Sequence, residues 1–253
     1  MQGSSKSQLA AIVLVLLWTG GPLGAEAEEV ALPSVLELQR AYLEANGGRA
    51  NLETIQSLRV SGRIEAADGP TLPFKIFRKR PALMRLITDY PGHSIESISD
   101  GESVKQRLVY PDGRSERIEL KDSVRQRLLH DSQVDGPFYQ LRGREDLVEV
   151  EAFETVGERE AVRLSIDPKT GLPYSKLWLD RENFQEIKLR SLSVAEDGSE
   201  LATEVYFDDF SPISGVWFPR KITYFVNGDF FSKVRIEEVS LNVGLFDSYF
   251  RVD

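Results

Sequence analysis

The chain has 253 residues, no cysteine, and 40 acidic against 31 basic residues, which gives a formal net charge of −9 at pH 7. A surface with this excess of negative charge repels phosphate backbones and argues against a nucleic-acid partner. Because no disulfide can staple the fold, its stability must come from a hydrophobic core.

The first residues are typical of a secretory signal peptide. Lys6 supplies a basic flank, an apolar run extends from Leu9 to Trp18, and Ala25-Glu26-Ala27 has the small-residue pattern of a cleavage site. We expect cleavage after Ala27, so that residues 1–27 are removed and 28–253 remain as a soluble exported protein. A retained N-terminal anchor is the alternative. The apolar run is shorter than the ~20 residues that a helix needs to cross a bilayer, so no membrane span is expected in the mature chain.

Two short helices are predicted at the start of the mature chain. Pro33 suits the first turn of a helix, and apolar residues then recur at helical spacing until Asn46-Gly47-Gly48 supplies a stop signal. This pattern predicts one amphipathic helix over 33–46. A second short helix is expected over 48–55.

From residue 57 onward the apolar residues alternate with polar ones, and Asp-Gly or Asn-Gly pairs punctuate the chain at regular intervals. Such pairs favour tight hairpin turns, so neighbouring strands are expected to pair as an antiparallel meander. The expected strands are 57–66, 72–80, 83–90, 94–100, 103–110, 114–120, 147–155, 160–167, 173–180, 184–194, 201–210, 215–226 and 230–243.

One segment, 121–141, interrupts this series with a helical pattern and a Gly-Pro loop, and we expect it to form a helix or lid set against the sheet. A sheet of about a dozen strands curls or closes on itself. The predicted fold is therefore mainly β: a curved antiparallel sheet that forms an open half β-barrel covered by short α-helices. No linker or composition break divides 28–253, which favours a single domain.

Residues that would indicate catalysis or cofactor binding are few. His93 and His130 stand alone, without a serine or cysteine nucleophile motif, and are interpreted as surface or structural residues. No histidine pair has metal-ligand spacing and no glycine-rich phosphate loop occurs, so neither a metal nor another cofactor is expected. The basic cluster Arg78-Lys79-Arg80 is interpreted as a solvated strand end before Pro81.

Paired carboxylates keep one enzymatic alternative open. Asp208-Asp209 and Glu237-Glu238 have the residue types that a glycoside hydrolase uses. Their expected role is nevertheless that of solvated faces and turns. A carboxylate-based hydrolase is therefore the last of the functions considered.

Several motifs resemble, in order and spacing across nearly the whole mature chain, those of LolA-like proteins, which are periplasmic lipoprotein carriers and their relatives. One departure is Val104-Lys105, where relatives often carry a tryptophan beyond the Asp-Gly hairpin. The matching motifs are Tyr42-Leu43-Glu44-Ala45-Asn46-Gly47-Gly48, Lys79-Arg80-Pro81-Ala82-Leu83-Met84-Arg85, Ser99-Asp100-Gly101, Val134-Asp135-Gly136-Pro137, Phe207-Asp208-Asp209-Phe210, Gly215-Val216-Trp217-Phe218-Pro219 and Asp247-Ser248-Tyr249-Phe250.

The resemblance implies an open barrel whose concave apolar interior accepts acyl chains of a lipoprotein or of another lipid, without catalysis. It also implies a role in outer-membrane lipoprotein or lipid sorting, with an inner-membrane donor and an outer-membrane acceptor as further partners. The main alternative is a regulator of the same fold that senses envelope stress by binding a membrane protein.

Strand alternation selects candidates for the concave wall, although the same residues would equally suit an ordinary filled core. Phe138 and Tyr139, beside Gly136-Pro137, are candidates for a lid. Arg59, Arg63 and Arg85 are candidates for contacts with an acidic head group or with a carboxylate of the protein. The candidate wall residues are Val60, Phe74, Ile76, Leu86, Leu177, Leu179, Phe207, Phe218, Ile222 and Tyr224.

Overall fold

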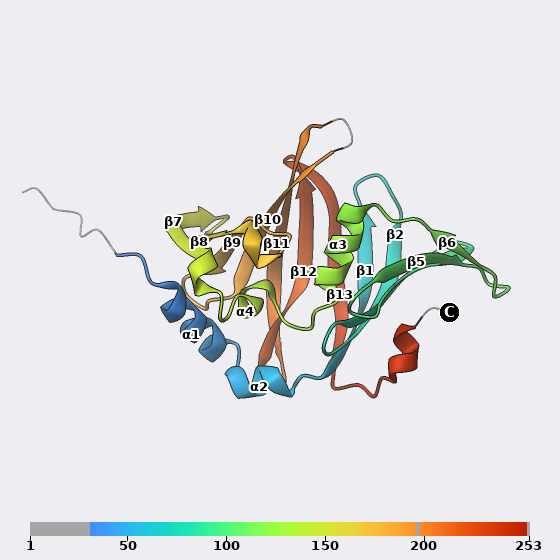
Figure 1. The fold of residues 1–253 in the computed structure, drawn as a ribbon, viewed down its shortest axis with the longest axis horizontal. Coiled ribbons are helices and arrows are strands. Elements are labelled where there is room, and N and C mark those ends of the chain that lie inside the picture. The colour runs from blue at the N-terminus through green and yellow to red at the C-terminus, as the bar shows by residue number, and fades with distance from the viewer. Residues whose placement is uncertain (1–30, 196–197, 252–253) are drawn as a thin grey trace, which may run out of the picture. The chain divides into compact units, whose positions relative to one another are not determined.

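The computed structural model describes residues 31–195 and 198–251, so the expected signal peptide and its cleavage site lie outside the described residues. From Leu32 onward the chain forms one compact unit. Its described residues contain a single sheet of thirteen antiparallel strands (Figure 1). The strands are β1 (Ser57–Ala66), β2 (Thr71–Lys79), β3 (Leu83–Tyr90), β4 (His93–Ser99), β5 (Val104–Val109), β6 (Ser115–Ile118), β7 (Val148–Val156), β8 (Arg159–Ile166), β9 (Lys176–Asp180), β10 (Glu186–Val194), β11 (Glu200–Ile213), β12 (Val216–Val226) and β13 (Asp229–Leu241).

The order of strands across the sheet is β6-β5-β4-β3-β2-β1-β13-β12-β11-β10-β9-β8-β7. Each strand therefore pairs with its sequence neighbour, except that β1 pairs with β13 and joins the two meanders β1–β6 and β7–β13. Strands β6 and β7 lie at opposite edges and do not pair with each other, so the sheet stays open. The predicted class, a large open antiparallel sheet with few short helices, is confirmed.

The chain must cross from one edge of this sheet to the other between β6 and β7. The connecting stretch, which we name the crossing segment (119–147), contains α3 (Asp122–Asp131), α4 (Pro137–Gln140) and a 3-10 turn (Glu145–Leu147). It passes in front of the strands (Figure 1). The helix or lid expected over 121–141 is thus two helices joined by a loop.

The chain before β1 forms α1 (Val35–Ala45) and α2 (Arg49–Thr54). Helix α1 starts one residue after Ser34, whose hydroxyl accepts a hydrogen bond from the Glu37 amide while the Glu37 carboxylate accepts one from the Ser34 amide. This capping box fixes the start two residues later than the predicted 33. None of the helices in the described ranges is long and apolar enough to span a membrane.

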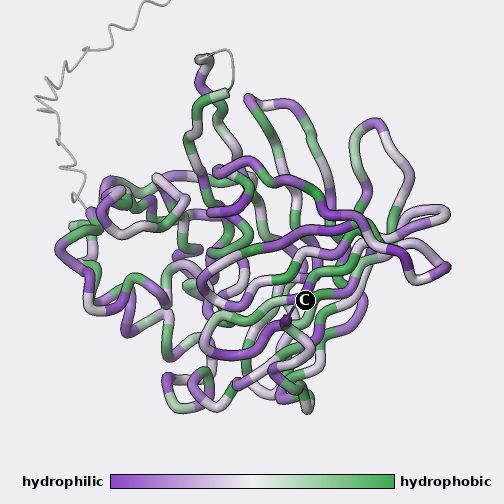
Figure 2. The backbone as a smooth tube through the Cα atoms, turned by 45° about the vertical axis from the view of Figure 1, so that its right-hand side comes forward, coloured by the Kyte–Doolittle hydropathy of each residue, from purple (hydrophilic) through white to green (hydrophobic). Residues whose placement is uncertain are grey.

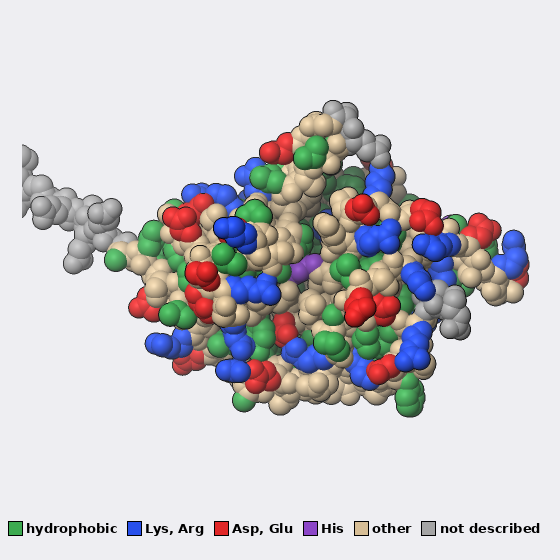
Figure 3. All heavy atoms as spheres, viewed as in Figure 1, with side chains coloured by type: hydrophobic (Ala, Val, Ile, Leu, Met, Phe, Trp, Pro, Cys, Tyr) green, Lys and Arg blue, Asp and Glu red, His purple; other side chains and the backbone are tan. Residues whose placement is uncertain are grey.

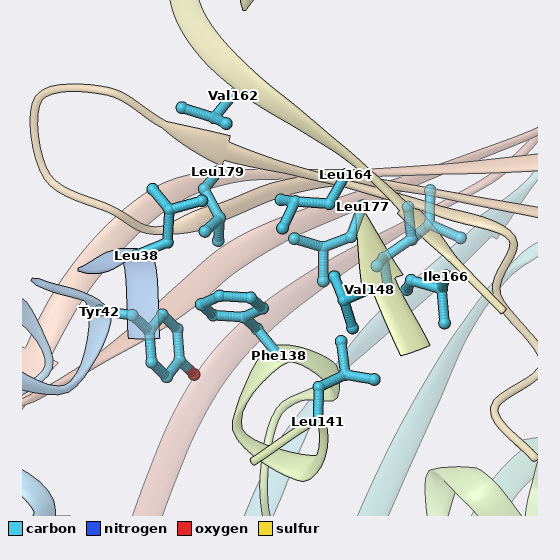
Figure 4. Close-up of a cluster of buried hydrophobic side chains, with 12 residues drawn as sticks. Leu38, Tyr42, Phe138, Leu141, Val148, Val162, Leu164, Ile166, Leu177 and Leu179 are labelled. Atoms are coloured by element: carbon cyan, nitrogen blue, oxygen red, sulfur yellow. The ribbon is translucent and has the colours of Figure 1, made fainter. Parts of the chain in front are cut away.

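Hydrophobic and polar residues alternate along the strands, as the tube coloured by hydropathy shows (Figure 2). The alternation gives the sheet one apolar face, on which the largest cluster of buried residues is built between α1, α4 and β7–β11 (Figure 4). The fully or nearly fully buried members are Leu38, Tyr42, Phe138, Leu141, Val148, Val162, Leu164, Ile166, Leu177, Leu179, Leu189 and Val205.

Candidate functional site

A cavity of about 400 Å³ lies between the apolar face of the sheet and the crossing segment. Strands β1 to β3 and β10 to β13 supply most of its wall, and residues 127–140 of the crossing segment supply the cover. In the space-filling view this face of the molecule is hollowed near its middle, beside α3 (Figure 3). The lining is mainly aliphatic and aromatic, so the cavity suits an apolar ligand.

Most of the candidate wall residues line this cavity. Strand register places them in rows: Val60 lies opposite Ile76, which lies opposite Leu86 on the next strand. Phe207 lies opposite Ile222 in the second meander. Their contact with a ligand stays a prediction. The predicted wall residues that line the cavity are Val60, Phe74, Ile76, Leu86, Phe207, Phe218, Ile222 and Tyr224.

Leu177 and Leu179 of β9 do not line the cavity. Both are fully buried in the cluster that α1 and α4 complete, where they pack with Phe138 and Leu141. The apolar face of the sheet is therefore filled at the β7–β9 end and hollow over β1–β3 and β10–β13. The alternative of an ordinary core applies to these two residues, and the expectation that they form part of an open wall was wrong.

The two candidate lid residues differ in their placement. Tyr139 lines the cavity, whereas Phe138 is fully buried and its ring lies edge-on to the Tyr42 ring at a centroid distance of 5.3 Å. The Phe138 amide also donates a hydrogen bond to Glu186 Oε1 at 2.8 Å. Phe138 therefore anchors α4 to the core, and Tyr139 contributes to the cover of the cavity.

The three candidate arginines lie away from the cavity. Alternation puts Arg59 and Arg63 on the face of β1 opposite to Val60, where they pair with Glu238 at 3.4 Å and Glu237 at 3.2 Å. Arg85 alternates in the same way with Leu86; its Nη2 donates to Glu96, and its guanidinium lies over the Tyr249 ring. None of the three is among the lining residues. Their expected contact with a head group has no support from this arrangement.

The basic cluster Arg78-Lys79-Arg80 was expected to be a solvated strand end, and the structure corrects this. Lys79 points outward and donates to Asp247 Oδ1 at 2.7 Å. Arg80 is mostly buried and forms an ion pair with Asp135 of the crossing segment. Arg78 lines the cavity. The three side chains separate because successive residues of a strand point to opposite faces and because Arg80 lies just past the end of β2.

Arg78 belongs to a group of polar residues at one part of the cavity, which we name the polar cluster: Arg78, Arg127, His130, Asp131, Tyr174 and Tyr224. The Arg127 guanidinium lies 5.4 Å from the Tyr224 ring centroid, and the His130 ring lies edge-on to the Tyr174 ring at a centroid distance of 5.0 Å.

The polar cluster shifts the pKa values of several of its members. Burial, and then the charge of Asp131, raise the pKa of both Tyr174 and Tyr224. Burial lowers the pKa of His130 and favours its neutral form. The sequence interpretation of His130 as a plain surface or structural residue missed its place in this cluster.

Glu186 and Tyr42 form a second polar spot on the cavity wall. Burial raises the pKa of Glu186 to about 7, although hydrogen bonds from the Phe138 amide and the Tyr42 hydroxyl favour the charged form. Gly136 approaches this carboxyl closely, since a Cβ at that position would lie 2.9 Å from Glu186 Oε1. No sequence pattern singled out Glu186, because it is a single acidic residue at the start of a strand.

The acidic residues that motivated the hydrolase alternative lie away from the cavity. Asp208 forms ion pairs with Arg159 and Lys221, and Glu237 and Glu238 pair with the arginines of β1. Neither these three residues nor Asp209 lines the cavity. In the part of the chain that the structure describes, no group of three or more His, Cys, Asp or Glu side chains is arranged to hold a metal ion.

No protein-family profile and no curated protein sequence matches the chain. Solved structures do match it in fold. An outer membrane lipoprotein-sorting protein domain from Vibrio parahaemolyticus aligns with a TM-score of 0.54 and 13% identity, over 85% of this chain and 95% of that one. A DUF1329 family protein from Desulfovibrio piger aligns with a TM-score of 0.56 and 14% identity, over 87% and 98%. A LolA superfamily protein from Nitrosomonas europaea aligns with a TM-score of 0.50 and 15% identity, over 87% and 99%.

Proposed function

We propose that this chain, which has the LolA-like fold, is a periplasmic binding protein that holds an acyl chain of a lipid or lipoprotein in its cavity and serves outer-membrane lipoprotein or lipid sorting. The observation that carries the proposal is the hollow half of the apolar sheet face, lined by aliphatic and aromatic side chains. The name of the Vibrio domain, which refers to lipoprotein sorting, supports the same direction.

The cavity gives such a ligand a sufficient driving force. Burying one acyl methylene is worth about 0.8 kcal/mol, so a chain of about ten methylenes would gain about 8 kcal/mol before the cost of association is subtracted. The volume of about 400 Å³ also lies within the range of about 300–1,000 Å³ that small-ligand sites occupy. A single acyl chain therefore fits this site better than a bulky polar substrate.

Access to the cavity depends on the crossing segment. This segment covers the hollow half and is held there by the pair between Arg80 and Asp135 and by the anchor of Phe138 in the core. Asp135 lies in the loop between α3 and α4, and Phe138 lies in α4 directly after it. A ligand can enter if this loop and α3 move away from the sheet while α4 stays docked.

The decisive experiment is to purify residues 28–253 from periplasm under gentle conditions and identify co-purifying molecules by native and denaturing mass spectrometry after organic extraction. A stoichiometric acylated species is the expected result and would name the ligand class. A protein that is free of lipid and takes up neither added lipid nor a synthetic lipopeptide would contradict the proposal. That result would favour the partner-binding regulator instead.

A further inference from the structure

The hollow, apolar half of the sheet contains an arginine, Arg78, that forms no ion pair within 4.0 Å among the residues the structure describes. Arg78 occupies an inward position of β2, in the same series as Phe74 and Ile76. Its cross-strand neighbours are Leu58 on β1 and Met84 on β3, both almost completely buried. A guanidinium in the middle of such a row costs stability unless something satisfies its charge and its N–H groups.

Nothing in the described part of the chain satisfies Arg78 fully. Its Nε is buried and has no hydrogen-bond partner there. Asp131 on α3 is close enough for its charge to raise the pKa of Arg78, yet burial outweighs it and the net direction is downward. The surroundings of Arg78 therefore disfavour its charge on balance, and a further anion beside it would be stabilised.

Further donors converge on the same place from different elements. Arg127 comes from α3, Tyr224 from β12, and Tyr174 from the loop before β9, and all three line the cavity with Arg78. Arginine and tyrosine donors are well suited to a carboxylate or a phosphate, because hydrogen bonds from a charged donor to an anion are the strong ones.

The charges that line the cavity leave an excess of positive charge in the polar cluster. Asp131 offsets one of its two arginines, and burial favours neutral His130. The other acidic lining residues are Asp135, which is paired with Arg80, and Glu186, whose pKa of about 7 keeps it largely protonated in mild acid. The positive charge of one guanidinium is therefore left to be neutralised by an anionic group of a ligand.

Resting on the proposed acyl-binding function, we propose that Arg78 and Arg127, assisted by the hydroxyls of Tyr174 and Tyr224, bind the anionic group of an acylated ligand whose chain lies along the apolar wall. The preferred ligand is then an anionic amphiphile with a carboxylate or phosphate head. The acylated cysteine of a lipoprotein is disfavoured, because its amide, ester and thioether linkages carry no negative charge.

The test compares head groups on one chain length. Delipidated protein comprising 28–253 is titrated calorimetrically with a C16 fatty acid, the corresponding monoacylglycerol phosphate, the uncharged monoacylglycerol, and an uncharged acylated lipopeptide. At least one anionic amphiphile should bind about 10-fold or more tightly than the uncharged monoacylglycerol, the size expected for one or two charged hydrogen bonds. Whichever anion binds better identifies the head as carboxylate or phosphate.

Two variants and a control connect the preference to these residues. Arg78→Met removes the guanidinium but keeps an unbranched side chain, and it should remove most of the preference for the anionic amphiphile over monoacylglycerol. Arg127→Met should act in the same direction. Arg59→Met removes an arginine from the opposite face of the sheet and should change neither affinity. Thermal unfolding of each variant shows whether it is folded, and Arg127→Met provides an independent test if Arg78→Met is not.

The possible failures are distinguishable. Equal binding of charged and uncharged amphiphiles, or an anionic preference that survives both substitutions, would overturn the head-group assignment and leave the acyl-binding function standing. Absence of binding for every amphiphile and for the lipopeptide would overturn the proposed function itself.

Discussion

Arg80 and Asp135 form a two-pronged ion pair that ties the crossing segment to the sheet just past the end of β2. Arg80 Nη2 lies 2.6 Å from Asp135 Oδ1, Nη1 bonds the other carboxylate oxygen, and Nε donates to the Ile55 carbonyl at 2.7 Å. One arginine thus holds together the cover of the cavity, the first strands and the end of α2. Both side chains are mostly buried, which makes this pair worth more than an exposed one.

Replacing Asp135 with asparagine should loosen the cover. The change keeps the size of the side chain and removes its charge, leaving Arg80 partly unpaired at a cost of about 1–3 kcal/mol. We expect faster amide hydrogen exchange in the crossing segment and faster uptake of an acylated probe in stopped-flow fluorescence. The control is Glu237→Gln, which disrupts the exposed pair with Arg63 on the other face. Unchanged exchange over 119–147 in the Asp135 variant would show that the pair does not hold the cover.

Glu186 should make the stability of the protein depend on pH in an unusual direction. In the folded protein the Glu186 carboxyl keeps its proton up to about pH 7, whereas in the unfolded chain the same carboxyl loses its proton near pH 4.5. The contribution of Glu186 to the free energy of unfolding is therefore fully present below pH 4.5 and is lost as the pH rises through 7. The slope of this loss is up to about 1.4 kcal/mol per pH unit.

Glu186→Gln should remove this contribution, because the amide has no proton to lose and still accepts from the Phe138 amide. Urea unfolding at pH 5, 6 and 7 should show that the free energy of unfolding of the variant, relative to wild type, increases with pH. Glu116→Gln, at an exposed position of β6, serves as the control and should give a pH-independent difference. Parallel pH profiles for wild type and Glu186→Gln would contradict the assignment.

The filled and hollow halves of the sheet should respond differently to the same truncation. Leu177→Ala opens a void in a fully packed cluster and should cost about 2–5 kcal/mol of unfolding free energy. Leu86→Ala enlarges a cavity that already exists, so it should cost clearly less but weaken the binding of an acylated ligand. Denaturant melts and calorimetric titration measure the two effects. Equal destabilisation would indicate that Leu86 lies in an ordinary core.

A charge in the hollow half should abolish ligand loading. Phe207→Glu places a carboxylate against Ile222 on the cavity wall, where it opposes an acyl chain more than it opposes folding. We expect the purified variant to lack co-purifying lipid while it keeps a cooperative thermal transition. Phe231→Glu, at a side chain 60% exposed on β13, adds the same charge away from the cavity and should leave loading intact. Loss of folding and loading together would point to a filled core.

Much of the architecture was predictable because strand alternation and Asp-Gly turns are local signals. Alternation tells which face a residue occupies but not what covers that face, so it could not separate Leu177, which α4 buries, from Phe207, which faces the cavity. Applied strictly, the same rule would have placed Arg59 and Arg85 outside and Arg78 inside. Three consecutive basic residues suggested a solvated end and obscured that signal. Glu186 acquires its role only from α1 and the crossing segment, which lie far from it in sequence.

The separation of β6 from β7 has a consequence for the range of ligands. A fully closed ring of strands has a circumference fixed by its hydrogen bonds, and its interior can change only if those bonds break. Here the two meanders share one hydrogen-bonded seam, β1 with β13. On the other side, among the described residues, the crossing segment alone connects the two edge strands β6 and β7. The cavity can therefore widen or narrow when the two meanders flex about this seam, without loss of backbone hydrogen bonds between strands. The size of the ligand that the cavity can hold is then limited by how far the crossing segment (119–147) can extend.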